Sequence, residues 1–192
     1  MTSIIKDDQI QTAAGGVPTA ADLGLNVSGS VLQVQSSVLN TSSGLSSSSW
    51  VDTGLSVTLT PKSTNSKFII CPSVTGSVGY FTWGIRIVRD GSPITESIHN
   101  TTNAANRTAT TMSHNDYNAG SGDTTNSNQY QMHNLAGSFH DTTSAPNTTT
   151  AITFKVQWWS YSAGAINRSV EDDNSSSRHR SASSLVVYEV EK

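Results

Sequence analysis

The stretch YFTWGIRIVRDG, residues 80–91, alternates apolar and polar side chains, with Phe81, Trp83, Ile85 and Ile87 on one face. This alternation is the period of a half-buried β-strand. Asp90-Gly91 follows as a dipeptide typical of tight hairpin turns, and SPITES, residues 92–97, is the expected return strand. The stretch therefore predicts a β-hairpin with an apolar face, in which Trp83 enters the core.

The same alternation recurs from residue 31 to the C-terminus, and no amphipathic helix of convincing length interrupts it. It is found in SVLQVQSSVL (30–39), GLSVTLTP (54–61), KFIICPSVTGSV (67–78), NQYQMHNLAGSFHD (128–141), TAITFKVQWWSYS (150–162) and SSLVVYEVEK (183–192). Many short strands separated by turn signals are typical of a sandwich or a jelly roll. We therefore predict an all-β fold, with one jelly-roll-like β-sandwich over residues 31–192.

Residues 1–30 differ from the rest, because Gly15, Gly16 and Pro18 in the run TAAGGVPTAADLG (12–24) interrupt any long helix or strand. The apolar residues of this segment are too sparse to bury one another. We expect an extended N-terminal arm that docks on a partner protein through Ile4, Ile5, Ile10, Val17, Leu23 and Leu25.

Composition excludes several classes of function. The formal net charge is -3 and no basic stripe is present, which argues against nucleic acid as a partner. No stretch reaches the about 20 apolar residues of a membrane helix, and MTSIIKDDQIQ lacks the apolar region of a secretory signal. We expect synthesis in a cytoplasm without membrane insertion. Cys71 is the single cysteine, so no disulfide can form within the chain.

No catalytic or metal-binding pattern stands out. The five histidines, His99, His114, His133, His140 and His179, lack ligand spacing, and the acidic triplet at 171–173 is more typical of a solvated loop than of a cation site. There is no Gly-x-Ser-x-Gly elbow and no phosphate-binding loop. A glycosidase pair from Glu96, Asp116, Asp123 and Asp141 is conceivable, but spacing alone does not indicate one. We predict a protein that is not an enzyme and has no cofactor.

Trp158 and Trp159 are adjacent and must point to opposite faces of a strand. One enters the core, and the other is either covered by a neighbouring subunit, which we favour, or free to stack on a sugar ring. Two long polar loops, Asn100–Asn128 and Asn167–Ser181, are either solvated or in contact with a receptor, and part of the first could form a strand near residues 107–113. The candidate contact residues are Tyr117, Arg178, His179 and Arg180.

The opening SIIKDDQIQTAAGGVPTAADLGLNVSGSVLQV, residues 3–34, closely resembles the N-terminal segment of tail fibre-like and other virion structural proteins of marine and freshwater tailed phages, cyanophages in particular. GLSVTLTPKSTNSKFII, IRIVRDGSPI, TTTAITFKVQWWS and INRSVEDDNSSSRHRSASSLVVYEVEK follow in the order of that group, so the resemblance covers nearly the whole chain. Its most specific parts are IQTAAGGVPTAADLG, residues 60–63 (TPKS) and residues 89–91 (RDG). Asp8 departs from it, since a neutral residue such as Thr is expected there.

The resemblance implies a homotrimeric, β-rich virion appendage that is assembled in the host cytoplasm and anchored by its N-terminal segment. Its implied partners are other virion proteins of the tail, baseplate or capsid, and a host surface polysaccharide. Alternatives are a capsid decoration protein or head fibre and, from a different class, a tailspike-type enzyme that degrades polysaccharide.

Overall fold

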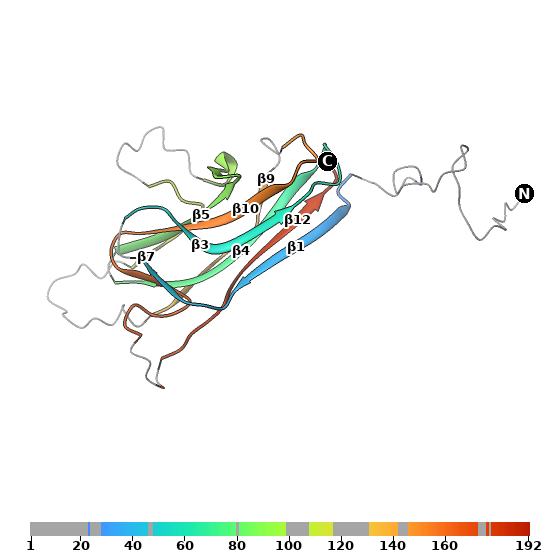
Figure 1. The fold of residues 1–192 in the computed structure, drawn as a ribbon. Helices are drawn as coiled ribbons and strands as arrows, with labels where there is room; N and C mark the ends of the chain where they lie inside the picture. Colours follow the sequence, from blue (N-terminus) through green and yellow to red (C-terminus); the bar gives the residue numbers. More distant parts are fainter. Residues whose placement is uncertain are drawn as a thin grey trace, which may run out of the picture.

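The structure is a computed structural model. It describes residue 23 and residues 28–45, 48–79, 81–98, 108–116, 131–141, 146–172, 176 and 178–192. Every regular element in these ranges is a strand, apart from the short 3-10 helix η1 (Thr95–Ser97). The described chain is all-β with two antiparallel sheets, the arrangement of a β-sandwich, as the alternation predicts (Figure 1).

The larger sheet, sheet A, has seven strands. Its order is β1-β12-β4-β11-β2, and β8 and β9 pair with the other edge of β4. The strands are β1 (Val31–Leu39), β2 (Ser43–Leu45), β4 (Lys67–Val78), β8 (His133–Ala136), β9 (Phe139–Asp141), β11 (Gly164–Ile166) and β12 (Ser183–Val190).

Sheet B has five strands, in the order β3-β10-β5-β6 with β7 paired to β5. The strands are β3 (Val51–Leu59), β5 (Phe81–Arg89), β6 (Ser92–Pro93), β7 (Met112–Asp116) and β10 (Ile152–Ser160). β7 overlaps the end of the strand expected near residues 107–113. Asp90 and Gly91 both have positive φ, 48° and 84°, and form the expected turn between β5 and β6.

Two details of this hairpin differ from the prediction. The return strand ends at Pro93 and the chain continues into η1, although the backbone N–H of Ile94 still donates to the carbonyl oxygen of Ile87 at 3.1 Å. Phe81 does not join Trp83 on the core face: it is 41% exposed, has a φ of 67°, and packs edge-on against Tyr161 with ring centroids 4.8 Å apart. A positive φ at the first residue of β5 breaks the regular alternation there, so the apolar face begins at Trp83.

The core lies between the sheets and is formed by the inward side chains of both. In β10 and β12 every second residue is buried, which is the pattern of a strand with one face on the core. The largest fully buried side chains are Trp83, Trp158, Phe68, Phe154, Leu55, Ile70, Ile85, Ile87, Ile166 and Leu185.

Two glycines of sheet A make room for the two core tryptophans of sheet B. A Cβ on Gly76 would lie 2.9 Å from the carbonyl oxygen of Ala165 and 3.1 Å from the ring of Trp83. A Cβ on Gly164 would lie 3.0 Å from the ring of Trp158. Larger residues at these positions would force the two sheets apart, so the close packing depends on glycine.

The sandwich has two ends with different contents. At the arm pole, defined by residues 28–30, 60–66 and 190–192, Gly29 and Ser30 form backbone hydrogen bonds of 2.8 and 3.0 Å with Glu191. The loop pole, defined by residues 39–41, 167–172 and 178–183, lies at the other end of β1 and β12, because Val31 pairs with Val190 and Leu39 with Ser183. Eight residues of β12 separate the poles by roughly 25 Å.

A buried carboxylate organises the arm pole. The Oε1 atom of Glu189 accepts hydrogen bonds from the backbone N–H groups of Lys62 (2.6 Å) and Ser63 (3.3 Å) and from the hydroxyl of Ser66. Its Oε2 atom accepts one from the side-chain amide of Gln33. The carboxylate therefore fixes the loop between β3 and β4, which contains the TPKS segment, onto β1 and β12.

We predict that Gly76→Ala lowers the free energy of unfolding by about 1–3 kcal/mol, because the added methyl overpacks the contact with Trp83 and a backbone carbonyl. The measurement is equilibrium unfolding in urea. Gly79→Ala is the matched control, since a Cβ there would meet its nearest neighbour at an ordinary 3.5 Å. Equal stability of the two variants would contradict this packing.

Candidate interaction surfaces

The adjacent tryptophans lie on opposite faces of β10, as the sequence predicts. Trp158 is buried in the core opposite Ile85, whereas Trp159 is half-buried on the outward face of sheet B opposite Gly84. Trp158 therefore has no surface to offer a neighbouring subunit. We expected one of the two at a subunit contact, and only Trp159 is placed to make it.

A linked set of polar side chains lies beside Trp159 on the same face. The Nε and Nη2 atoms of Arg86 donate to Oε1 of Gln157 at 2.9 and 2.7 Å. Nε2 of Gln157 donates to Asp52 at 2.8 Å, and Nζ of Lys155 donates to the other oxygen of Asp52, also at 2.8 Å. We call Trp50, Asp52, Arg86, Lys155, Gln157 and Trp159 the sheet B patch.

The sheet B patch combines aromatic rings with charge. The guanidinium of Arg86 lies 4.3 Å from the ring centroid of Trp50, a cation–π contact. Hydrogen bonds from Lys155 and Gln157 hold the pKa of Asp52 below its ordinary value, so this carboxylate is charged at neutral pH. Burial lowers the pKa of Arg86, yet a guanidinium stays charged in proteins. Aromatic faces beside fixed donors and acceptors are groups suited to stacking on and hydrogen bonding to a sugar ring.

The outward face of sheet A has a different composition. Three rows of paired residues cross β1, β12 and β4, and we call them the sheet A face. The rows are Val34–Tyr188–Ile69, Ser36–Val186–Cys71 and Val38–Ser184–Ser73. Val34 is 46% exposed and Val38 67% exposed, and the β12 and β4 members of the rows are half-buried. This face is apolar or hydroxyl-bearing and has no charged member.

Asn167 holds the loop pole together, a role that no sequence pattern indicates beyond the tolerance of asparagine for left-handed backbone. Its φ is 61° and its side chain is buried. Nδ2 donates to the carbonyl oxygens of Leu39 (2.8 Å) and Thr41 (2.9 Å), and Oδ1 accepts from the hydroxyl of Ser183 at 2.5 Å. Asn167 is therefore a structural residue, and the polar loop that we expected to start there starts after it.

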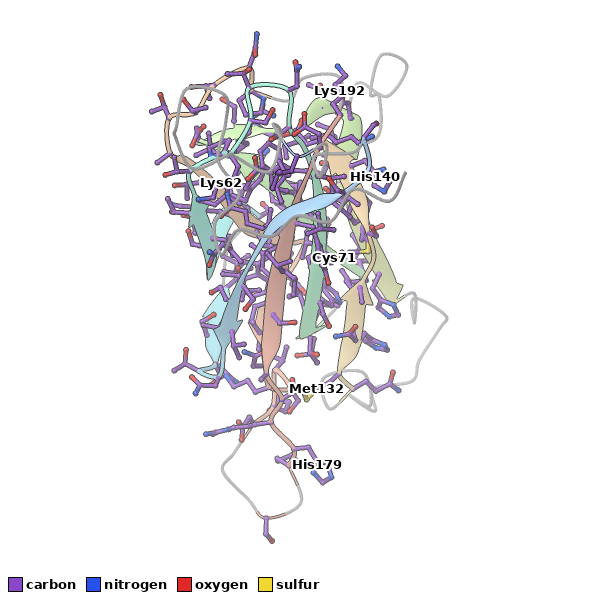
Figure 2. The ribbon with its side chains drawn as sticks, turned by 90° about the vertical axis from the view of Figure 1, so that its right-hand side faces the viewer. Lys62, Cys71, Met132, His140, His179 and Lys192 are labelled. Carbon is purple, nitrogen blue, oxygen red and sulfur yellow. The ribbon has the colours of Figure 1, made fainter. Side chains whose placement is uncertain are left out.

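The predicted contact residues of that loop lie at the loop pole. Figure 2 shows His179 beyond the end of the sheets, opposite Lys62 and Lys192. His179 and Arg180 are exposed, whereas Arg178 is half-buried. Nε of Arg180 donates to Asp172 at 2.7 Å, so one carboxylate of the acidic triplet is matched by a cation from the same loop. Tyr117 and most of residues 100–128 lie outside the described residues.

The predicted docking residues Ile4, Ile5, Ile10, Val17 and Leu25 also lie outside the described residues. Leu23 is described and is 45% exposed. The arm and its partner therefore stay a prediction.

Of the four acidic residues considered for glycoside hydrolysis, the structure describes the side chains of Glu96 and Asp141. Asp141 is buried and forms an ion pair with Arg89, which links β9 of sheet A to β5 of sheet B. Glu96 is exposed on η1, and the side chains of Asp116 and Asp123 lie outside the described part. Among the described residues, Asp141 is the buried member of this set. Its contact with Arg89 is structural, because it joins the two sheets.

The described histidines do not gather with other ligand side chains. The rings of His114 and His133 stack with centroids 3.7 Å apart and 21° between their planes, which joins β7 to β8 across the sandwich. His140 and His179 lie at opposite ends of the molecule (Figure 2). In the described ranges, no three side chains of His, Cys, Asp or Glu form a group that could hold a metal ion.

Comparison with models of known protein families and with curated proteins finds no match for this chain. Among the described residues, no helix has the length and apolar character needed to span a bilayer. The function is therefore inferred from the surfaces described above.

We predict that Asn167→Ala lowers the free energy of unfolding by about 2–4 kcal/mol, because two carbonyls lose a buried donor at about 1 kcal/mol each and alanine disfavours the left-handed backbone. Thermal and urea unfolding measure the change. The exposed Asn147 provides the control, since Asn147→Ala should be neutral. A loss below about 0.5 kcal/mol for Asn167→Ala, the range of ordinary surface changes, would show that the contacts are not needed.

Proposed function

We propose that this chain is a non-enzymatic structural protein of a tailed-phage virion: a short fibre-like appendage, anchored by its N-terminal arm, whose β domain meets the host surface. The proposal rests on one observation, which is that the two ends of the domain differ. The chain enters at the arm pole beside Glu191, and the exposed His179 and Arg180 lie a full strand length away at the loop pole. A body that is held at one end and carries polar groups at the other suits an attachment appendage.

We further propose that the sandwich is a jelly roll and that the protein is a homotrimer. Strand pairing supports the first part, because β1 pairs with β12, β3 with β10, β4 with β9 and β5 with β7. These pairs are nested, as in one long hairpin wound across two sheets, which is the connectivity of jelly rolls. The exposed valines of β1 support the homotrimer, because burial of these side chains between subunits would stabilise an assembly, whereas exposure to water does not stabilise a monomer.

The absence of catalytic activity is part of this proposal. Two buried carboxylates, Asp141 and Glu189, contact Arg89 and the loop of residues 62–66 and so have structural tasks. An assay on host envelope polysaccharide separates this function from that of a degrading tailspike: the purified protein should bind without shortening the polymer. Immunogold labelling of particles separates a tail or baseplate appendage from a capsid decoration protein or head fibre.

The first test concerns the arm. Deleting residues 2–28 spares the backbone hydrogen bonds of Gly29 and Ser30, so the remaining domain should keep its melting temperature and its oligomeric mass. The truncated protein should nevertheless be missing from assembled particles. Immunoblotting of purified particles against a full-length control makes the measurement. Truncated protein at normal copy number would move attachment to the β domain.

The second test concerns the loop pole. Exchange of residues 173–179 for a Gly/Ser linker removes Arg178 and His179 while it spares Asn167 and the bond between Asp172 and Arg180. Adsorption of the particles to host cells should fall about tenfold, a loss of about 1.4 kcal/mol of binding, without a change in melting temperature. Lys62→Ala, which removes an exposed cation at the arm pole, should leave adsorption unchanged. Normal adsorption after the exchange would show that this loop does not contact the receptor.

A further inference from the structure

The two outward faces of the sandwich differ in composition, although both belong to antiparallel sheets. Apart from Trp159, the outward side chains of sheet B on β3 and β10 are charged, amide or hydroxyl groups: Asp52, Ser56, Thr58, Thr153, Lys155 and Gln157. The nine members of the three rows of the sheet A face are three valines, an isoleucine, a tyrosine, a cysteine and three serines, and none of them is charged. An antiparallel sheet that faces water on one side is expected to be polar there, so sheet B fits this expectation and sheet A does not.

The edge of sheet A is also unusual. β1 is the terminal strand of the sheet order, has nine residues, and contains neither a charged residue nor a proline. No charged residue occurs in the sequence between Asp22 and Asp52. Natural proteins protect exposed edge strands with lysine, proline, short length or a covering segment. β1 has a bulge near Val31 but no charge, so the edge is suited to being covered.

Polar residues border the sheet A face. The next row towards the arm pole, Val31–Val190–Lys67, ends on a lysine. Beyond β4, the side-chain amide of Asn134 donates to the hydroxyls of Ser73 (3.1 Å) and Thr75 (3.0 Å). An apolar centre with a polar rim is the usual anatomy of a protein interface.

We propose that the sheet A face, together with the β1 edge, is the surface through which copies of this chain pack on one another. A second copy presents the same uncharged rows, so no like charges are brought together at the centre of the contact. The outward faces of β1, β12 and β4 together cover roughly 400 Å². The β1 edge adds to this area, and a specific interface buries about 600–1,000 Å² per partner.

The number of copies, three, rests on the proposed function, whereas the choice of face does not. In a trimer, the β1 edge of one copy contacts the sheet A face of the next around the ring, a head-to-tail arrangement that closes after three steps. β1 and β12 run from pole to pole, so a threefold axis parallel to them brings three arm poles together at one end. The three loop poles meet at the other end, and the sheet B patch faces outward. This arrangement leaves Trp159 uncovered, in place of the subunit contact that we favoured from the sequence.

The experiment compares two double variants by light scattering at micromolar concentration. Val34→Lys with Val38→Lys places two charges on the edge strand of sheet A, at positions that are exposed in the single chain. Ser56→Lys with Thr58→Lys places two charges on β3, the edge strand of sheet B, also at exposed positions. We expect wild type and the β3 variant at three times the 20.3 kDa of one chain, and the β1 variant at 20.3 kDa with an unchanged circular dichroism spectrum.

The outcomes separate the two proposals. If the β1 variant keeps the wild-type trimer mass, the sheet A face is not the interface, but the protein is still a trimer. A wild-type dimer that the β1 variant dissociates supports the face and overturns the trimer. A wild-type monomer overturns both.

Cys71 provides a second readout that needs no substitution. It is half-buried in the central row of the face and is the single cysteine of the chain. Its labelling by a maleimide should be slow at micromolar concentration and should accelerate at least tenfold on dilution to nanomolar concentration, where the copies separate. A rate that does not depend on concentration, together with an assembled mass at micromolar concentration, would place the contact elsewhere.

Discussion

The packing of Trp83 and Trp158 against Gly76 and Gly164 is the contact on which the rest of the sandwich depends. The two indole rings come from neighbouring strands of sheet B and reach the backbone of sheet A, where no Cβ fits. This contact sets the register of β10 and β5 relative to β4 and β11. Once Trp158 is fixed inward, the alternation of β10 directs Gln157 and Trp159 outward, and the sheet B patch follows.

Much of the fold follows from side-chain alternation, because burial of one face imposes a period of two on each strand. β4 has the bounds of the stretch KFIICPSVTGSV, and the Asp90-Gly91 turn adopts the positive φ values that its residues favour. The exposed position of Phe81 was not predictable, since it depends on one backbone angle. The choice between Trp158 and Trp159 could have been predicted, because Trp158 is in phase with the apolar Ile152, Phe154 and Val156, whereas Trp159 is in phase with Lys155 and Gln157.

The roles of the polar residues that hold the two poles together could not be predicted from the sequence. Glu189 and Asn167 bind groups that are more than 120 residues distant along the chain, and neither belongs to a motif. Their neighbours exist only after the sheets have formed. The same holds for the sheet A face: Val34, Val186 and Ile69 fit the strand pattern individually, but their alignment into uncharged rows is a property of the pairing register.

We propose that the two faces of one sandwich have separate tasks, with sheet A turned towards other copies and sheet B towards the surroundings. Hydroxyl-radical footprinting read by mass spectrometry tests it within one sample, because Tyr188 and Trp159 are both half-buried in the single chain and lie on opposite faces. Assembly should protect Tyr188 and Ile69 from oxidation, relative to the dissociated chain, and leave Trp159 and Trp50 reactive. Protection of Trp159 with continued oxidation of Tyr188 would instead place the contact between copies on sheet B.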